Sequence, residues 1–130
     1  MIKIRQGIDI VEIGKLQNVM GRHDSFVSDI FTDREQQYCL SRKEPLLHFA
    51  GRFAAKESYL KALGTGFSGP GIDHVFREIE VLPSNSGSPG ITVSGWIAKI
   101  AKKKRIDQCC VSISHSGSYA VASVILTGTD

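Results

Sequence analysis

Two charged residues, Lys56 and Glu57, lie in a segment that has the spacing of an apolar helix. At about 100° per residue, Phe49, Phe53 and Leu60 fall within about 40° of one another, and the two charges border this apolar stripe. An isolated charge is costly to bury, because the protein interior offers it no water. We therefore expect both side chains to be paired, or to bind a metal ion or a ligand.

Asp9 is a second carboxylate that the sequence places where water reaches it poorly. It belongs to a strand predicted over residues 2–13, on the same face as Val11 and Ile13. Asp9 and Glu57 come from separate elements without a histidine or cysteine cluster, and such a pair suits Mg²⁺, which takes one or two carboxylates, waters and phosphate oxygens. The alternatives are an edge-facing acid or one that caps a neighbouring loop.

Cations accompany the carboxylate on the same helix. Arg52 and Lys56 are spaced i, i+4, and so are Glu57 and Lys61. The helix ends in Gly-Thr-Gly at residues 64–66, where glycines allow backbone amides to approach an anion closely. Together these features predict a phosphate site. Surface ion pairing of the cations and a plain helix C-cap at the first glycine are the alternatives.

The remaining elements must hold this helix against the first strand. One side of the helix carries small residues that allow close approach, namely Ala54, Ala55, Ser58 and Ala62. The helix begins at Pro45, and Thr32 with Glu35 forms a capping box that predicts another helix to about residue 41. Further helices are predicted at 14–22 and at 95–105, the latter with Trp96, Ile97 and Ile100 facing inward. Strands are predicted at 75–82, 91–94, 109–114 and 119–126, with turns at 83–90 and 115–118. This order predicts one compact α+β domain over residues 1–130, with a mostly antiparallel sheet.

Composition narrows the class of protein. No apolar run is long enough to span a bilayer, and the N-terminus lacks a signal-peptide core. The three cysteines are odd in number, and two are adjacent, so we expect reduced thiols in a cytoplasmic protein. The net charge of +3 is mild, and the basic run at 102–105 lacks interleaved aromatic residues, which disfavours nucleic-acid binding. That run is a solvated helix face or a guide for an acidic partner.

Three segments resemble the holo-acyl-carrier-protein synthases, the small members of the 4′-phosphopantetheinyl transferase superfamily. They are GIDIV at 7–11, RFAAKESYLKALGTG at 52–66 and VSISH at 111–115, and the likeness spans essentially the whole chain. The resemblance implies a 4′-phosphopantetheinyl transferase-like fold with the sheet packed on a long central helix. It also implies transfer of phosphopantetheine from coenzyme A to a serine of apo acyl carrier protein, which leaves adenosine 3′,5′-bisphosphate.

The resemblance also implies roles for individual residues. Asp9 and Glu57 match magnesium ligands, and Lys56 matches a residue near the reacting phosphate. The serine proton would pass to Glu57 or to a metal-bound water. The residues that match positions holding the coenzyme A nucleotide and its phosphates are Arg52, Lys61, Gly64, Thr65, Gly66 and His115. Without the resemblance, His115 alone would be interpreted as structural.

Partners follow from the same likeness. Larger members of the superfamily contain two copies of the fold with the site between them, so this single copy is expected to form a homotrimer with sites between subunits. Lys15 stands where the family usually has an arginine that touches the carrier protein, and it lacks the bidentate guanidinium fork. Carriers of fatty-acid and of polyketide synthesis both fit these motifs. A rival interpretation is a module that binds coenzyme A without transferring its phosphopantetheine.

Overall fold

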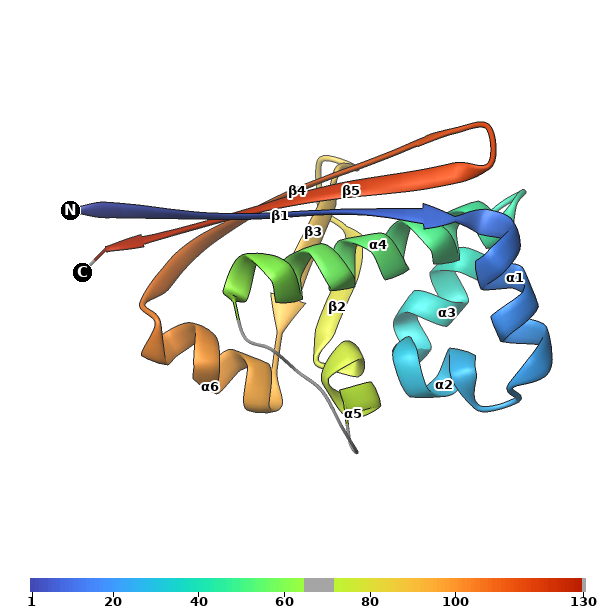
Figure 1. Ribbon diagram of the computed structural model, residues 1–130, viewed down its shortest axis with the longest axis horizontal. Coiled ribbons are helices and arrows are strands. Elements are labelled where there is room, and N and C mark those ends of the chain that lie inside the picture. The colour runs from blue at the N-terminus through green and yellow to red at the C-terminus, as the bar shows by residue number, and fades with distance from the viewer. Residues whose placement is uncertain (65–71, 130) are drawn as a thin grey trace.

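The computed structural model describes residues 1–64 and 72–129 (Figure 1). The elements, in chain order, are β1 (Ile2–Glu12), α1 (Ile13–Arg22), α2 (Phe26–Ile30), α3 (Asp33–Leu40), α4 (Pro45–Leu63), α5 (Ile72–Arg77), β2 (Ile79–Pro83), β3 (Pro89–Val93), α6 (Gly95–Lys103), β4 (Ile106–Ser116) and β5 (Tyr119–Thr129). None of the helices within this described part has both the length and the apolar character needed to cross a bilayer.

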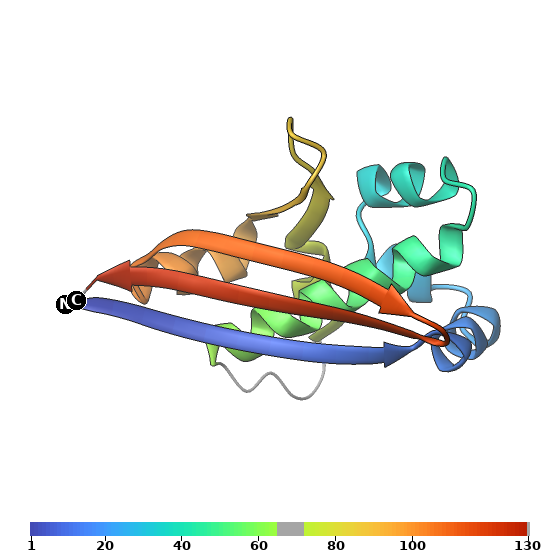
Figure 2. The ribbon, with the colours of Figure 1, turned by 90° about the horizontal axis from the view of Figure 1, so that it is seen from above.

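Two antiparallel sheets build the fold. Strands β1, β5 and β4 form one sheet in that order, and β2 pairs with β3 as a hairpin. Helix α4 runs along one face of the three-stranded sheet, and the other helices lie on that same side (Figure 1). Figure 2 shows the sheet from its open side, with α4 behind it. The α+β class and the long central helix are therefore confirmed.

The small residues of α4 pack against the sheet, as their pattern predicts. Ala54, Ala55 and Ala62 are buried, and the Ser58 hydroxyl donates a 2.9 Å hydrogen bond to the carbonyl oxygen of Ala122 on β5. The closest approach is at Gly7 of β1, which leaves no space for a side chain. Because Asp9 is two residues farther along the same face of β1, this contact also fixes where its carboxylate lies.

We expect Gly7→Ala to destabilise the protein by several kcal/mol, because overpacking at a backbone contact forces the strand off the helix. The added Cβ would clash with the carbonyl oxygen of Ser58 and lie 2.7 Å from the backbone nitrogen of Ala62. Gly14→Ala in α1 is the matched control, because nothing lies within 4 Å of its Cβ position. In a helix interior that change should stabilise by up to about 1 kcal/mol. Urea unfolding measures both, and equal midpoints would contradict the packing described here.

Three local predictions were wrong. Residues 75–82 form the end of α5 and then β2, since Val75 and Phe76 are both buried, which a strand with one covered face does not allow. Helix α2 carries no side-chain cap and was missed. Strand β4 continues through His115 and Ser116, so the turn is shorter than expected.

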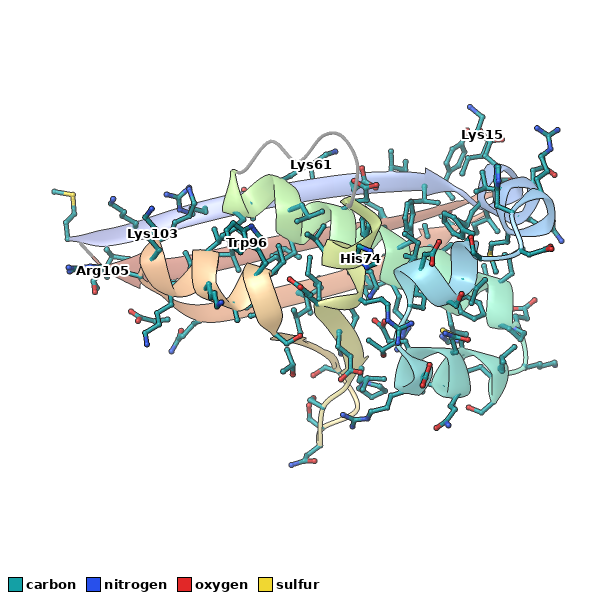
Figure 3. The ribbon with its side chains drawn as sticks, turned by 90° about the horizontal axis from the view of Figure 1, so that it is seen from below. Lys15, Lys61, His74, Trp96, Lys103 and Arg105 are labelled. Carbon is teal, nitrogen blue, oxygen red and sulfur yellow. The ribbon has the colours of Figure 1, made fainter. Side chains whose placement is uncertain are left out.

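Trp96 also differs from its prediction. It lies at the start of α6 and is 59% exposed, whereas Ile97 and Ala101, four residues apart on one face, are buried (Figure 3). The inward stripe of α6 therefore runs through Ile97 and Ala101, and Trp96 lies beside it on the outer surface.

The open face of the three-stranded sheet carries exposed apolar side chains along β1. Ile2, Ile4, Ile8 and Ile10 of β1 are each between 59% and 71% exposed, and Tyr119 and Ile125 of β5 are also exposed. The register sets Ile10 opposite Val121, whereas Ser123 lies opposite Ile8. An apolar surface of this kind is typical of a protein–protein interface.

Candidate functional site

Asp9, Glu57 and Lys61 meet on the flank of α4 beside β1, and we call them the carboxylate site. The Nζ atom of Lys61 lies 2.9 Å from Oδ1 of Asp9 and 3.1 Å from the carbonyl oxygen of Ile8. Burial raises the pKa of the Glu57 carboxyl, the negative charge of Asp9 raises it further, and Lys61 lowers it. The two carboxylates thus repel each other and draw in a cation. Figure 3 shows Lys61 beside β1.

The donor set of this site fits a hard cation. In residues 1–64 and 72–129 there is no group of three histidine, cysteine, aspartate or glutamate side chains that could hold a metal ion. A closed zinc site therefore does not fit, whereas Mg²⁺ needs only one or two carboxylates besides water and phosphate oxygens. The ammonium group of Lys61 already holds the position of a cation on Asp9.

Lys56 is not part of the carboxylate site, which corrects the role predicted for it. Its Nζ atom donates to Glu35 Oε1 at 2.7 Å, to the carbonyl oxygen of Phe76 at 2.7 Å and to that of Ile79 at 2.6 Å. Both side chains of the ion pair are fully buried. An ammonium group has three N–H donors, so none is left for a phosphate. Lys56 instead joins α4 to α3, α5 and β2, and Lys61 is the cation beside the carboxylates.

A pocket on the other flank of α4 contains Arg52 and His115, and we call it the histidine pocket. It has a volume of about 190 Å³. The guanidinium carbon of Arg52 lies 4.2 Å from the centre of the Tyr38 ring. Arg52 is only 5% exposed, and its buried Nε atom has no hydrogen-bond partner in the described structure. The residues that line the pocket include Tyr38, His48, Arg52, Ile113 and His115, with Pro83, Gly87 and Pro89 from the β2–β3 hairpin.

The carboxylate site and the histidine pocket lie on opposite flanks of α4. Arg52 and Glu57 are five residues apart, which separates their side chains by about 140° around the helix. Asp9 on β1 and Ile113 on β4 both pair with Ala122 of β5, so they lie two strand spacings apart, or about 10 Å. The chain therefore holds its carboxylates and its histidine pocket on separate surfaces.

The phosphate site predicted at residues 64–66 can be compared with the structure only at Gly64, where α4 ends. Gly64 adopts a left-handed conformation with φ of 77°, and its N–H donates to the carbonyl oxygens of Leu60 and Lys61. This amide caps the helix and is not available to an anion. Thr65 and Gly66 lie outside the described residues. Arg5 is a cation near this helix end that sequence analysis did not consider, and its Nη1 atom would lie 3.4 Å from a Cβ at Gly64. The alternation of β1 puts Arg5 on the same face as Asp9, and this pattern could have indicated it.

An apolar groove begins at Asp9 and extends along α1. Its lining residues are Asp9, Ile10, Val11, Glu12, Lys15, Leu16, Val19, Phe26 and Phe53. Lys15 lies at its edge, where its Nζ atom is 3.6 Å from a carboxylate oxygen of Glu12 and is largely exposed (Figure 3). The groove therefore combines an apolar floor with a cation, directly beside one ligand of the carboxylate site.

The sequence was compared with known proteins. The sequence pattern of the 4′-phosphopantetheinyl transferase superfamily matches residues 5–124. A holo-[acyl-carrier-protein] synthase of Syntrophus aciditrophicus is 43% identical over 123 residues, which is 94% of each chain. One from Halalkalibacterium halodurans is 42% identical over 126 residues, or 95% of this chain and 94% of that one.

Solved structures give the same likeness. An ACPS–CoA complex of Chronobacterium ammoniagenes superposes with a TM-score of 0.86 at 30% identity, covering 98% of this chain and 99% of that one. A holo-(acyl-carrier-protein) synthase of Bacillus anthracis in complex with CoA (3′,5′-ADP) gives a TM-score of 0.76 at 33% identity, covering 99% and 100%.

Proposed function

Because the chain belongs to the 4′-phosphopantetheinyl transferase superfamily, we propose that it acts as a holo-acyl-carrier-protein synthase. It moves phosphopantetheine from coenzyme A to a serine of apo acyl carrier protein. The observation that carries this proposal is the carboxylate site, in which two repelling carboxylates and a partly exposed lysine lie next to an apolar groove. A module that only binds coenzyme A has no use for such a carboxylate pair.

The residues of the carboxylate site account for the transfer. The serine oxygen bonds to the phosphorus that carries pantetheine, as the bond from that phosphorus to the leaving adenosine 3′,5′-bisphosphate breaks. Glu57, or a water bound to the metal, would accept the serine proton. Lys61 is 54% exposed and can turn from Asp9 to a phosphate oxygen. Mg²⁺ held by Asp9 and Glu57 would neutralise charge on the pyrophosphate.

The nucleotide end of coenzyme A belongs in the histidine pocket, because Arg52 and His115 both line that cavity. Because the pocket and the carboxylate site of one subunit lie on opposite flanks of α4, we place each active site between two subunits. The exposed isoleucines of β1 supply an apolar surface for that assembly. A closed ring of such heterologous contacts is a trimer in the arrangement that the resemblance implies.

The carrier protein docks in the apolar groove along α1. The groove ends at Asp9, so a serine presented there reaches the carboxylate site, and Lys15 with Arg22 of α1 suits an acidic partner surface. The chain acts as one unit over residues 1–130. Cys39, Cys109 and Cys110 are free thiols, which supports a place in the reducing cytoplasm.

The test of this function is mass spectrometry of an apo acyl carrier protein incubated with coenzyme A, magnesium and this chain. We expect the mass of one phosphopantetheine on the carrier serine, and loss of the product when a chelator removes magnesium. Binding of coenzyme A without any product, across carriers of fatty-acid and polyketide synthesis, would favour the non-catalytic module instead.

A further inference from the structure

His48 is a titratable residue of the histidine pocket that neither the mechanism nor the sequence motifs use. It lies on α4 one turn before Arg52, so both side chains project toward the same cavity. Its ring packs edge-on against Tyr38, with centroids 5.7 Å apart and planes at 87°. This packing fixes the direction of the imidazole within the pocket.

The surroundings of His48 are strongly positive. Arg52 on α4, Arg42 in the α3–α4 connection and His115 on β4 all act on it, and Glu44 is the acid that opposes them. Tyr38 of α3 supplies the remaining polar neighbour. Burial lowers the pKa of His48 below its ordinary value, Arg52, Arg42 and His115 lower it further, and Glu44 raises it. The empty pocket therefore favours the neutral imidazole.

An anion in this pocket reverses that balance. A phosphate brings negative charge and acceptor oxygens, which favour the protonated form of a neighbouring histidine. The guanidinium group of Arg52 supplies a permanent positive charge for such an anion, because Arg52 lines the pocket and is held against the Tyr38 ring. His48 then adds a second charge only when a proton comes from solvent.

We propose that His48 is a pH-dependent ligand of the histidine pocket, which takes up a proton from solvent when the pocket binds the phosphate monoester of coenzyme A. The proposal rests on the proposed function for the identity of the ligand. Its chemistry, recognition of a phosphate monoester by a permanent guanidinium and an induced imidazolium, follows from the pocket itself. Uptake of the proton on binding is largest at pH values between the pKa of His48 in the free protein and its pKa in the complex. The contribution of His48 to affinity falls across this range and is lost at higher pH.

Binding measurements with coenzyme A and 3′-dephospho-coenzyme A test this inference. For coenzyme A, we expect His48→Gln to weaken binding about tenfold near neutral pH, the typical effect of one charge-assisted hydrogen bond, and to have little effect at pH near 9. Because every other group of the protein and of the ligand is the same in both measurements, the ratio of the wild-type affinity to the variant affinity isolates His48. His48→Phe, which keeps the ring contact with Tyr38, should behave like His48→Gln.

Calorimetry in two buffers of different ionisation enthalpy counts the protons taken up. The wild type should take up more protons per coenzyme A than His48→Gln, and His74→Gln, an exposed histidine of α5 (Figure 3), should match the wild type. The inference is overturned if the affinity ratio does not change with pH, or if 3′-dephospho-coenzyme A shows the same dependence on His48. Failure of the proposed function is a separate result, namely absent transfer by mass spectrometry while this pH-linked binding persists.

Discussion

Replacing Asp9 by asparagine, or Glu57 by glutamine, is expected to reduce transfer of phosphopantetheine by at least about a hundredfold, as for loss of one preorganised electrostatic group at a reacting centre. Both changes keep the shape of the side chain and remove a negative charge from the carboxylate site. The fold should tolerate them, because Lys61, the partner of Asp9, is 54% exposed. Initial rates of carrier modification at saturating coenzyme A measure the loss.

Stability separates a functional carboxylate from a structural one. The raised pKa of Glu57 means that folding disfavours its ionised form, so the ionised carboxylate destabilises the folded state increasingly as the pH rises through that pKa. Glu57→Gln should therefore not lower the free energy of unfolding at neutral pH. Asp33→Asn, at an acid that is 87% exposed, is the activity control and should leave the rate unchanged. A wild-type rate in Asp9→Asn or Glu57→Gln would remove the catalytic assignment.

Lys56→Met is expected to cost about 3–5 kcal/mol of unfolding free energy, the usual result of breaking a buried ion pair from one side. The variant leaves the carboxylate of Glu35 fully buried, with the N–H groups of Val81 and Thr32 as its remaining partners. It also strands the carbonyl oxygens of Phe76 and Ile79, which accept from Lys56. Guanidinium unfolding monitored by circular dichroism gives this free energy.

Two further variants make this prediction specific. Adding Glu35→Gln to Lys56→Met removes the unpaired charge, so the double variant should be more stable than Lys56→Met alone. Lys61→Met on the same helix breaks only an exposed ion pair, worth up to about 1 kcal/mol, yet it should impair transfer. The reverse outcome, a stable Lys56→Met and an unstable Lys61→Met, would contradict the buried structural role of Lys56 and favour it as the lysine that acts at the carboxylate site.

Periodicity and capping were sufficient to predict most of the framework. The capping box at Thr32 and Glu35 is present, α4 begins at Pro45, and its small residues meet the sheet. These features depend on neighbours within a turn or two of helix, or on the alternation of one strand. The carboxylate pair was found in the same way, because Asp9 and Glu57 each looked poorly solvated on its own element.

Contacts between elements that are distant in the sequence explain the features that sequence analysis did not predict. Sequence analysis recognised that Lys56 needs a partner, but Glu35 was already explained by its capping box, and its second role becomes visible only when α3 and α4 pack together. Sequence analysis gave His48 no role, because His115, which acts on it, comes from a distant strand. Alternation puts Ile2, Ile4, Ile8 and Ile10 on one face of β1, but only the sheet order shows that no element of residues 1–64 or 72–129 covers it (Figure 2).

The most direct test of a shared active site is to mix two inactive variants. Asp9→Asn removes a carboxylate but leaves the histidine pocket intact, and Arg52→Met does the opposite. If the two sites act together across a subunit interface, dissociating and reassembling an equal mixture should restore up to about a quarter of the wild-type transfer rate, since one random interface in four pairs both intact sites. A mixture that stays as inactive as either variant, although mixed oligomers have formed, would contradict an active site built from two subunits.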